Sequence, residues 1–176
     1  MSVIGLKKAN CKNCYKCVKV CPVKSIKVEN EQAQIVDRTC ILCGTCLEQC
    51  PQDAKTVNSD AARVREMLRA GEKVILSVAP SYIACYSMKE PERFAGAMKA
   101  LGFFGVSETS EGAAYVTAEY HKLLREGTSG NLVTTCCPSF NRLVEIYYPD
   151  LVGQLTPVVS PMIAHARLLK RAHPGV

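Results

Sequence analysis

The sequence predicts a chain of two parts that differ in fold class: a small α+β module over residues 1–57, and an incomplete α/β domain with a parallel sheet over residues 58–176. Two observations predict this division. Eight of the eleven cysteines lie in the first part, which has little room for a conventional apolar core. From Ser59 onward, segments with helical periodicity alternate with short apolar runs, a pattern typical of a parallel sheet covered by helices.

The eight cysteines of the first part follow one spacing twice. The pattern C-x2-C-x2-C-x3-C-P begins at Cys11 and begins again at Cys40, twenty-nine residues later, with Pro22 and Pro51 in matching positions. This doubled pattern is the ligand set of a bacterial-type ferredoxin with two 4Fe-4S clusters, in which the fourth cysteine of each run serves the other cluster. We therefore expect one cluster on Cys11, Cys14, Cys17 and Cys50, and the second on Cys40, Cys43, Cys46 and Cys21.

Zinc and disulfides are the alternative uses of these thiols. Structural zinc commonly takes two separated C-x2-C pairs, whereas each run here carries a third thiol and a C-P ending that tetrahedral zinc does not require. A disulfide framework suits a small secreted chain, but the stretch Met1 to Lys8 has no apolar run of the length that a signal peptide needs. We expect reduced thiols in a cytoplasmic protein.

The formal net charge of +6 treats the cysteines as neutral. An oxidised 4Fe-4S core with four thiolates carries about −2, so two clusters bring the molecule close to charge balance. The lysines of the first thirty residues are then expected to offset cluster charge and to guide docking of a redox partner. No aromatic-basic interleaving or recognition motif accompanies them, so we expect no nucleic-acid binding. No apolar stretch approaches the roughly 18–20 residues of a membrane span.

Short elements are expected in the first part and longer ones in the second. Ile26 with Val28, and Ile35 with Val36, indicate short strands, and each C-P run is expected to open a helical turn. In the second part, the periodicity predicts helices from a Ser59 cap to Gly71, and over residues 91–102, 111–125, 140–147 and 162–171. Strands are predicted over residues 73–79, 104–106 and 132–135.

Two loops follow predicted strands at the edge of the sheet where ligands usually bind. They are Ala79-Pro80-Ser81 and Thr135-Cys136-Cys137-Pro138. Because the carboxyl ends of parallel strands meet at one edge, we expect both loops to face the same crevice.

Three motifs in the second part carry a family resemblance. A double ferredoxin module followed by SVAPS, then TTCCPSF, then LTPVVSPM, resembles the iron-only (FeFe) hydrogenases over essentially the whole chain. The run SPMIAH is most similar to the sensory branch of that family.

The resemblance implies roles for individual residues. Ala79, Pro80 and Ser81 match the segment that lines the active-site cavity. Cys136 matches the cysteine that relays protons to the distal iron of the catalytic H-cluster, Cys137 the first thiolate ligand of its cubane part, and Ser160 the relay serine. Side chains of adjacent residues in an extended backbone point to opposite sides, which fits different roles for Cys136 and Cys137.

The sequence also departs from the family pattern. The helix before TTCCP keeps Glu119, but Tyr120 and Leu123 lie near the positions where proton-transfer glutamates are expected, which predicts slow proton delivery. The family's second and third cluster motifs, with three more cysteines, are expected beyond residue 176. We therefore expect a truncated amino-terminal portion of an H-cluster domain, with an H-cluster only if those motifs are supplied.

The expected function is that of an iron-sulfur electron-transfer segment of an iron-only hydrogenase-like oxidoreductase, in hydrogen conversion or hydrogen sensing. The expected partner is a ferredoxin or another electron carrier, with a sensory or signalling domain further along the chain. A stand-alone ferredoxin-type carrier with an inert appended domain is the alternative. Kinship with the relatives that assist iron-sulfur assembly in eukaryotes is disfavoured by the doubled Cys136-Cys137.

Three further residues are more simply explained without a functional role. Cys85 lies among small and aromatic residues and is expected to be buried in packing. His121 and His165 fall on predicted helices, where a surface histidine or a hydrogen-bonded core histidine is commoner than a ligand.

Overall fold

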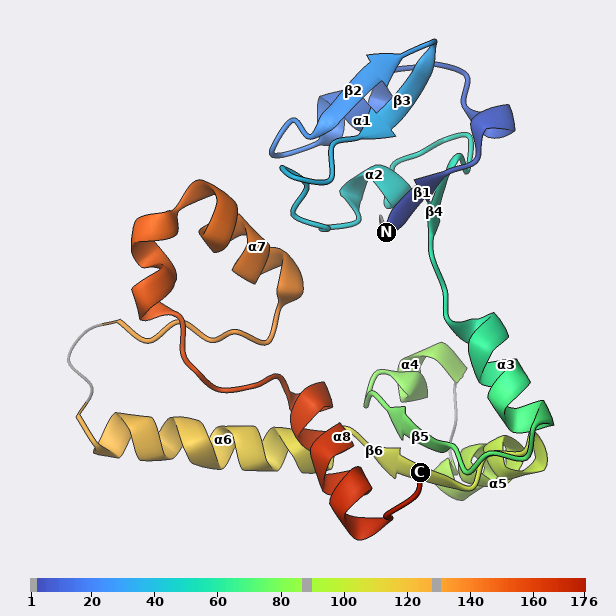
Figure 1. Cartoon of the computed structure of the whole chain (residues 1–176), viewed down its shortest axis with the longest axis vertical. Helices are drawn as coiled ribbons and strands as arrows, with labels where there is room; N and C mark the ends of the chain where they lie inside the picture. The colour runs from blue at the N-terminus through green and yellow to red at the C-terminus, as the bar shows by residue number, and fades with distance from the viewer. Residues whose placement is uncertain (1–2, 87–89, 128–130) are drawn as a thin grey trace. The chain divides into compact units, whose positions relative to one another are not determined.

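The computed structural model describes residues 3–86, 90–127 and 131–176 and contains two compact units (Figure 1). We call the first the cysteine unit, which consists of Met1–Ser59 and Cys137–Leu155, and the second the sheet unit, which consists of Asp60–Cys136 and Thr156–Val176. The predicted fold class is confirmed, since small antiparallel sheets in the cysteine unit are followed by a parallel sheet with helices.

Two short antiparallel sheets form the framework of the cysteine unit. Strand β1 (Ile4–Leu6) pairs with β4 (Lys55–Val57), and β2 (Ile26–Glu29) pairs with β3 (Gln32–Ile35). The strands expected around Ile26 and Ile35 are confirmed. The 29-residue offset of the cysteine runs also relates the two sheets, because the register pair Val28↔Ala33 maps onto Val57↔Ile4.

Each cysteine run of the cysteine unit contains one short helix. The 3-10 helix η1 (Lys8–Asn10) precedes the first run, α1 (Lys16–Val20) lies within it, and α2 (Thr45–Glu48) lies within the second. Each helix ends before its C-P pair, and a turn follows at the proline. The expected helical turn therefore exists in each run but comes before the proline, because the first helical residue follows a left-handed residue at Tyr15 or Gly44.

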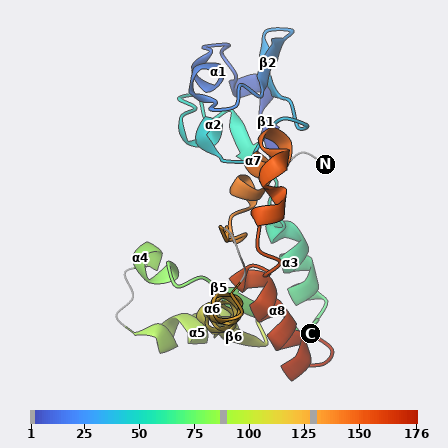
Figure 2. The same cartoon turned by 90° about the vertical axis from the view of Figure 1, so that its left-hand side faces the viewer.

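A later segment returns to the cysteine unit. Helix α7 (Pro138–Tyr147), which confirms the helix predicted over residues 140–147, and η2 (Pro149–Gln154) both belong to it. Tyr147 donates its hydroxyl to Thr39 O at 2.8 Å, so α7 lies beside the loop that leads into the second cysteine run (Figure 2).

The sheet unit is built on two parallel strands. Strand β5 (Ile75–Val78) pairs in parallel with β6 (Gly105–Glu108), with Ile75 opposite Gly105, which confirms the predicted strands and their parallel arrangement. The chain passes between them through α4 (Tyr82–Tyr86), which the sequence analysis did not predict, and α5 (Pro91–Ala100). Tyr82 and Phe94 are buried, and their tilted rings contact each other with centroids 4.8 Å apart.

Among the described residues, the sheet unit also contains α3 (Ala61–Arg69), α6 (Ser110–Arg125) and α8 (Pro161–Ala172). All three were predicted. Helix α3 ends at Arg69 and is followed, after the Ala70 cap, by the expected Gly71, whose φ of +74° is readily adopted only by glycine. Its amino-terminal cap is Asp60, one residue after the expected Ser59.

One predicted strand is absent. Residues 132–135 were expected to add a strand to the parallel sheet, but they show only an isolated bridge at Val133. The Val133 carbonyl accepts from Thr156 N–H at 2.9 Å, and the Thr135 hydroxyl donates to Val158 O at 2.7 Å. One of these two hydrogen bonds is made by a side chain and not by the backbone. Residues 132–135 and the segment before α8 therefore do not form the regular backbone ladder that defines a strand.

Helices α6 and α8 cross closely in the sheet unit. A Cβ on Gly112 would lie 2.2 Å from Pro161 O and 2.7 Å from His165 Cβ, so only glycine permits this approach. His165 is fully buried beneath the crossing, with Nδ1 2.8 Å from Ser77 Oγ and Nε2 2.9 Å from Ser107 Oγ. No helix among the described residues combines the length and apolar content needed to cross a bilayer.

Candidate metal centre

Four thiols that are far apart in the sequence line one cavity of the cysteine unit. Cys11, Cys14 and Cys17 come from the first run, and Cys50 comes from the end of the second. This is the combination that the sequence analysis expected for one cluster. Within the described ranges, no three histidine, cysteine or acidic side chains converge on a point suited to a single metal ion, so the four thiols surround a space instead of meeting at its centre.

The thiols expected for the other cluster also lie in the cysteine unit. Burial raises the pKa of Cys46, and the nearby Cys40 and Cys43 thiols add to this rise. Cys21 is buried in the same apolar cluster as Cys46 and Cys17. Cys40 completes the predicted set as a buried residue, and Cys43 as an exposed one.

Backbone N–H groups point at the thiols in a repeated pattern. The fourth cysteine of each run accepts from the amide four residues on, Ser25 N to Cys21 Sγ at 3.2 Å and Ala54 N to Cys50 Sγ at 3.3 Å. Leu42 N donates to Cys40 Sγ at 3.4 Å. Hydrogen bonds from backbone groups stabilise a thiolate and tune a cluster that it holds.

The first cysteine of the first run has the same kind of partner. Hydrogen bonds from the backbone of Ala33 and Asn13 lower the pKa of Cys11, and the charge of Lys55 adds a smaller effect. Cys17 differs, because burial raises its pKa and Lys55 opposes that rise. The site therefore contains hydrogen-bond donors and a cation that favour thiolates.

Residues with positive φ recur at equivalent positions of the two runs. A positive φ is uncommon for residues other than glycine and costs such a residue a conformational free energy of roughly 1 kcal/mol or more. Its recurrence at equivalent positions indicates that the two loops share one specific backbone conformation. The equivalent pairs are Asn13 with Leu42, Tyr15 with Gly44, and Lys24 with Asp53. Thiols with inward N–H donors in two repeated loops are the donor set that 4Fe-4S clusters require, so the residues present fit that cofactor.

The predicted cavity segment lies after β5. Ala79, Pro80 and Ser81 are exposed, and Ala79 O accepts from Tyr82 N at 3.0 Å as the chain enters α4. Cys136 and Cys137 are both exposed. Cys136 is the last residue of the segment 60–136 of the sheet unit, whereas Cys137 belongs to the cysteine unit, where it is the amino-terminal cap of α7. The crevice expected to be shared by these two loops stays a prediction.

Ser160 has a structural partner. Its hydroxyl accepts from Ile163 N at 3.3 Å and caps α8. Its relay role stays a prediction beside this capping role. Four residues earlier, Thr156 is buried, and its hydroxyl lies 3.4 Å from the Tyr120 hydroxyl on α6.

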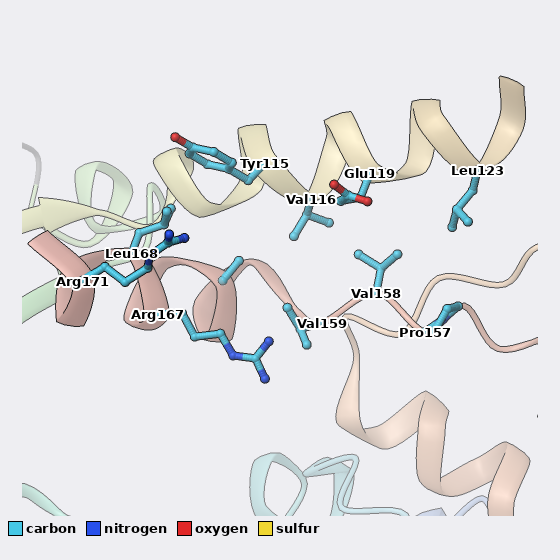
Figure 3. Close-up of a pocket in the computed structure, with 11 residues that line it drawn as sticks. Tyr115, Val116, Glu119, Leu123, Pro157, Val158, Val159, Arg167, Leu168 and Arg171 are labelled. Atoms are coloured by element: carbon cyan, nitrogen blue, oxygen red, sulfur yellow. The ribbon is translucent and has the colours of Figure 1, made fainter. Parts of the chain in front are cut away.

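The acid that the sequence retains on α6 lies in a groove. A groove of about 490 Å³ runs along α6, the segment before α8 and α8 itself, and Glu119 and Leu123 line it together with Arg167 and Arg171 (Figure 3). The rest of the lining is mainly apolar, with Val116, Val158 and Leu168 among the labelled side chains. Leu123 therefore provides an apolar side chain where an acid was expected from the family pattern.

For His165, His121 and Cys85, the sequence favoured explanations without a functional role, and the structure confirms some of these and not others. His165 is a hydrogen-bonded core histidine, as expected, and His121 is exposed on α6. Cys85 was expected to be buried, and this is wrong. It is exposed, because α4 directs Tyr82 to the core as its buried residue.

Two residues of the cysteine unit were missed by the sequence analysis. Lys55 is buried at 6% exposure, and Arg142 of α7 donates Nε to Cys40 O at 2.8 Å and Nη2 to Asp37 O at 2.9 Å. The sequence could have indicated Lys55, since the 29-residue offset places it at the position equivalent to Ile26, an apolar residue of a predicted strand. Arg142 had none, because its partners are more than a hundred residues away.

Comparison with known proteins agrees with this donor set. Residues 4–65 match the family model of a 4Fe-4S dicluster domain, so the chain is an iron-sulfur protein. Residues 72–175, more than half of the chain, match the iron only hydrogenase large subunit, C-terminal domain. The chain therefore belongs to the iron-only hydrogenase family.

Two curated relatives show how much of a longer protein this chain resembles. It is 28% identical over 139 residues to iron hydrogenase 1 of Clostridium pasteurianum, an alignment that covers 72% of this chain and 24% of that protein. It is 44% identical over 57 residues to NADH-quinone oxidoreductase subunit I 2 of Geobacter metallireducens, covering 27% of this chain and 44% of that one. The chain thus spans less than half the length of either relative.

Proposed function

We propose that this chain is the iron-sulfur electron-transfer segment of an iron-only hydrogenase-like oxidoreductase. It carries two 4Fe-4S clusters, one on Cys11, Cys14, Cys17 and Cys50 and the other on Cys40, Cys43, Cys46 and Cys21. Residues 1–57 act as the ferredoxin domain, and residues 58–176 as the amino-terminal portion of the H-cluster domain. The partner is a ferredoxin or similar electron carrier.

The observation that best supports this proposal is the single cavity lined by three thiols of one run and the last thiol of the other. Two clusters that exchange ligands in this way lie close together, which suits the passage of single electrons. When bound, the clusters supply one-electron redox chemistry. The chain's own residues hold the thiolates and direct N–H groups at them.

In this proposal, Cys136 and Cys137 contribute side chains to the catalytic centre. Cys137 provides one thiolate to the H-cluster, whose other ligands come from sequence outside this chain. Cys136, which is exposed, holds and releases a proton at its Sγ as a general acid and base. Ala79, Pro80 and Ser81 line the cavity, and Ser160 continues the proton route.

Within the family, we propose a sensing role in place of rapid hydrogen conversion. The support is the lining of the α6 groove, where Glu119 is the acid and Leu123 is apolar. An apolar side chain cannot pass a proton, so proton delivery along α6 is slow. A sensor tolerates slow turnover, whereas a high-turnover enzyme does not.

The first experiment measures metal in the anaerobically reconstituted chain. We expect about eight iron and about eight sulfide per chain, as two cubanes require. The sequence that follows codon 176 in the gene then separates the proposal from the alternative of a stand-alone carrier. A P-C-x-x-K-K segment within a few dozen residues supports the proposal, and a stop codon favours the carrier.

A second experiment tests the proton role of Cys136 in the full-length protein with its H-cluster inserted. We expect Cys136→Ser to reduce hydrogen uptake steeply, because a hydroxyl is a far weaker acid than a thiol at neutral pH. Cys85→Ser, at another exposed thiol of the sheet unit, is the control and keeps the parent rate. An unchanged rate in Cys136→Ser removes this residue from the relay.

A further inference from the structure

Lys55 breaks the internal symmetry of the cysteine unit. The 29-residue offset superposes Cys21 on Cys50, Ser25 on Ala54, and Ile26 on Lys55. The strand register follows the same rule, since Ile26 pairs with Ile35 and Lys55 pairs with Leu6. One copy of the repeat therefore has an apolar side chain where the other has an ammonium group.

Both side chains are buried at this equivalent position. Ile26 is 8% exposed and packs with Cys17, Cys21 and Cys46 in the apolar cluster. Lys55 is 6% exposed and lines the cavity of Cys11, Cys14, Cys17 and Cys50. The fold at this position accepts an aliphatic residue, so packing alone does not call for a lysine.

The Lys55 ammonium group is held in a fixed place. Its Nζ donates to Ala33 O at 2.6 Å in a buried hydrogen bond. Ala33 is itself buried, and its backbone also hydrogen-bonds the Cys11 thiol. The Lys55 ammonium group and the Cys11 thiol therefore both hydrogen-bond the backbone of Ala33 in β3.

The charge belongs to a residue that lines the cavity of one thiol set, together with Cys11, Cys14, Cys17 and Cys50. A buried ammonium group is costly unless a counter-charge compensates it. Thiolates and the clusters they hold provide that negative charge.

We propose that Lys55 makes the two clusters electrochemically unequal by raising the reduction potential of the cluster held by Cys11, Cys14, Cys17 and Cys50 above that of its partner. This inference rests on the proposed function, because it requires both clusters to be present. Reduction adds one electron to a site that is already negative, so a nearby fixed positive charge favours the reduced form. At the equivalent position of the other repeat, Ile26 provides no charge.

The consequence is a direction for electron flow inside the cysteine unit. An electron rests preferentially on the cluster beside Lys55. It returns to the cluster on Cys40, Cys43, Cys46 and Cys21 only by moving to a lower potential. Lys55 is thus a positioning residue for the electron, since it acts through the thiolates without taking part in transfer.

The test is a redox titration of the anaerobically reconstituted chain, followed by electron paramagnetic resonance. In Lys55→Ile, the residue of the equivalent repeat position replaces the lysine, so packing has a precedent in the same fold. We expect both midpoint potentials to shift to more negative values, one by clearly more than the other. Lys55→Arg retains the charge and is expected to stay close to wild type.

The control is Lys27→Met. It removes the same charge from the same unit, but at a side chain that is 54% exposed and paired with Glu29 at 2.7 Å. Water and salt screen such a charge, so its midpoint potentials are expected to match those of wild type.

Two results overturn the inference without touching the proposed function. The first is a Lys55→Ile protein with wild-type iron content and unchanged midpoint potentials. The second is loss of the clusters in both Lys55→Ile and Lys55→Met while Lys55→Arg retains them, which makes Lys55 an assembly residue. A wild-type chain that binds no clusters contradicts the proposed function itself.

Discussion

The fourth cysteine of each run has its chemistry set by a residue four positions further on. Ser25 donates its amide to Cys21 Sγ, and Ala54 donates its amide to Cys50 Sγ. Each of these thiols also follows a helical turn, α1 or α2, that contains the third cysteine of its own run. At the scale of single residues, the last thiol of each run therefore has a backbone N–H donor in the same relative position.

This exchange of ligands can be tested with pairs of substitutions. Cys11→Ala and Cys50→Ala remove ligands from one cluster, so the double variant should lose no more iron than either single variant, about four of about eight atoms per chain. Cys11→Ala with Cys21→Ala removes a ligand from each cluster and should lose nearly all the iron. Iron analysis after reconstitution measures both. The reverse result, with Cys11 and Cys21 behaving as one pair, contradicts the exchange.

At the scale of elements, close packing fixes the position of helices that carry site residues. Helix α8 begins at the Ser160 cap and crosses α6 at Gly112, above the buried His165. Helix α7 follows its Cys137 cap, and its Arg142 donates one hydrogen bond to Cys40 O in the second cysteine run and one to Asp37 O just before that run. The proposed H-cluster ligand and a cluster loop therefore share one compact unit.

The crossing of α6 and α8 gives a stability prediction. Gly112→Ala places a methyl group against Pro161 O and His165, and such overpacking should lower the free energy of unfolding by about 1–3 kcal/mol. Gly96→Ala is the matched control, because Gly96 lies within α5 and its added Cβ meets nothing within 4 Å. Alanine there should raise stability by about 0.5–1 kcal/mol. Thermal unfolding measures both variants, and equal midpoints contradict the predicted crossing.

At the scale of the whole molecule, the net charge depends on whether the proposed clusters are bound. The formal charge of +6 is that of a chain without clusters. The two proposed clusters, each of about −2, would bring it close to neutrality. Lys55 is the part of this balance that lies inside the fold, whereas Lys27 is an exposed part.

Much of this arrangement could be predicted from the sequence, because the strongest signals were local. The cysteine spacing predicted two ligand sets, and the four thiols of one of these sets line one cavity, while apolar runs predicted β5 and β6. Residues 132–135 (Leu-Val-Thr-Thr) also have residue types that favour a strand, but they have no regular ladder partner, and the local sequence cannot show that. The return of α7 to the cysteine unit depends on Arg142 and Tyr147 contacts with residues distant in sequence, so it too could not be predicted.

The most direct test of the central claim is the electron paramagnetic resonance spectrum of the anaerobically reconstituted chain after reduction with dithionite. Two low-potential 4Fe-4S clusters in one small unit should give two interacting spins. A reduced sample that shows no iron-sulfur signal, or a chain that stays colourless and free of iron after reconstitution, contradicts the account.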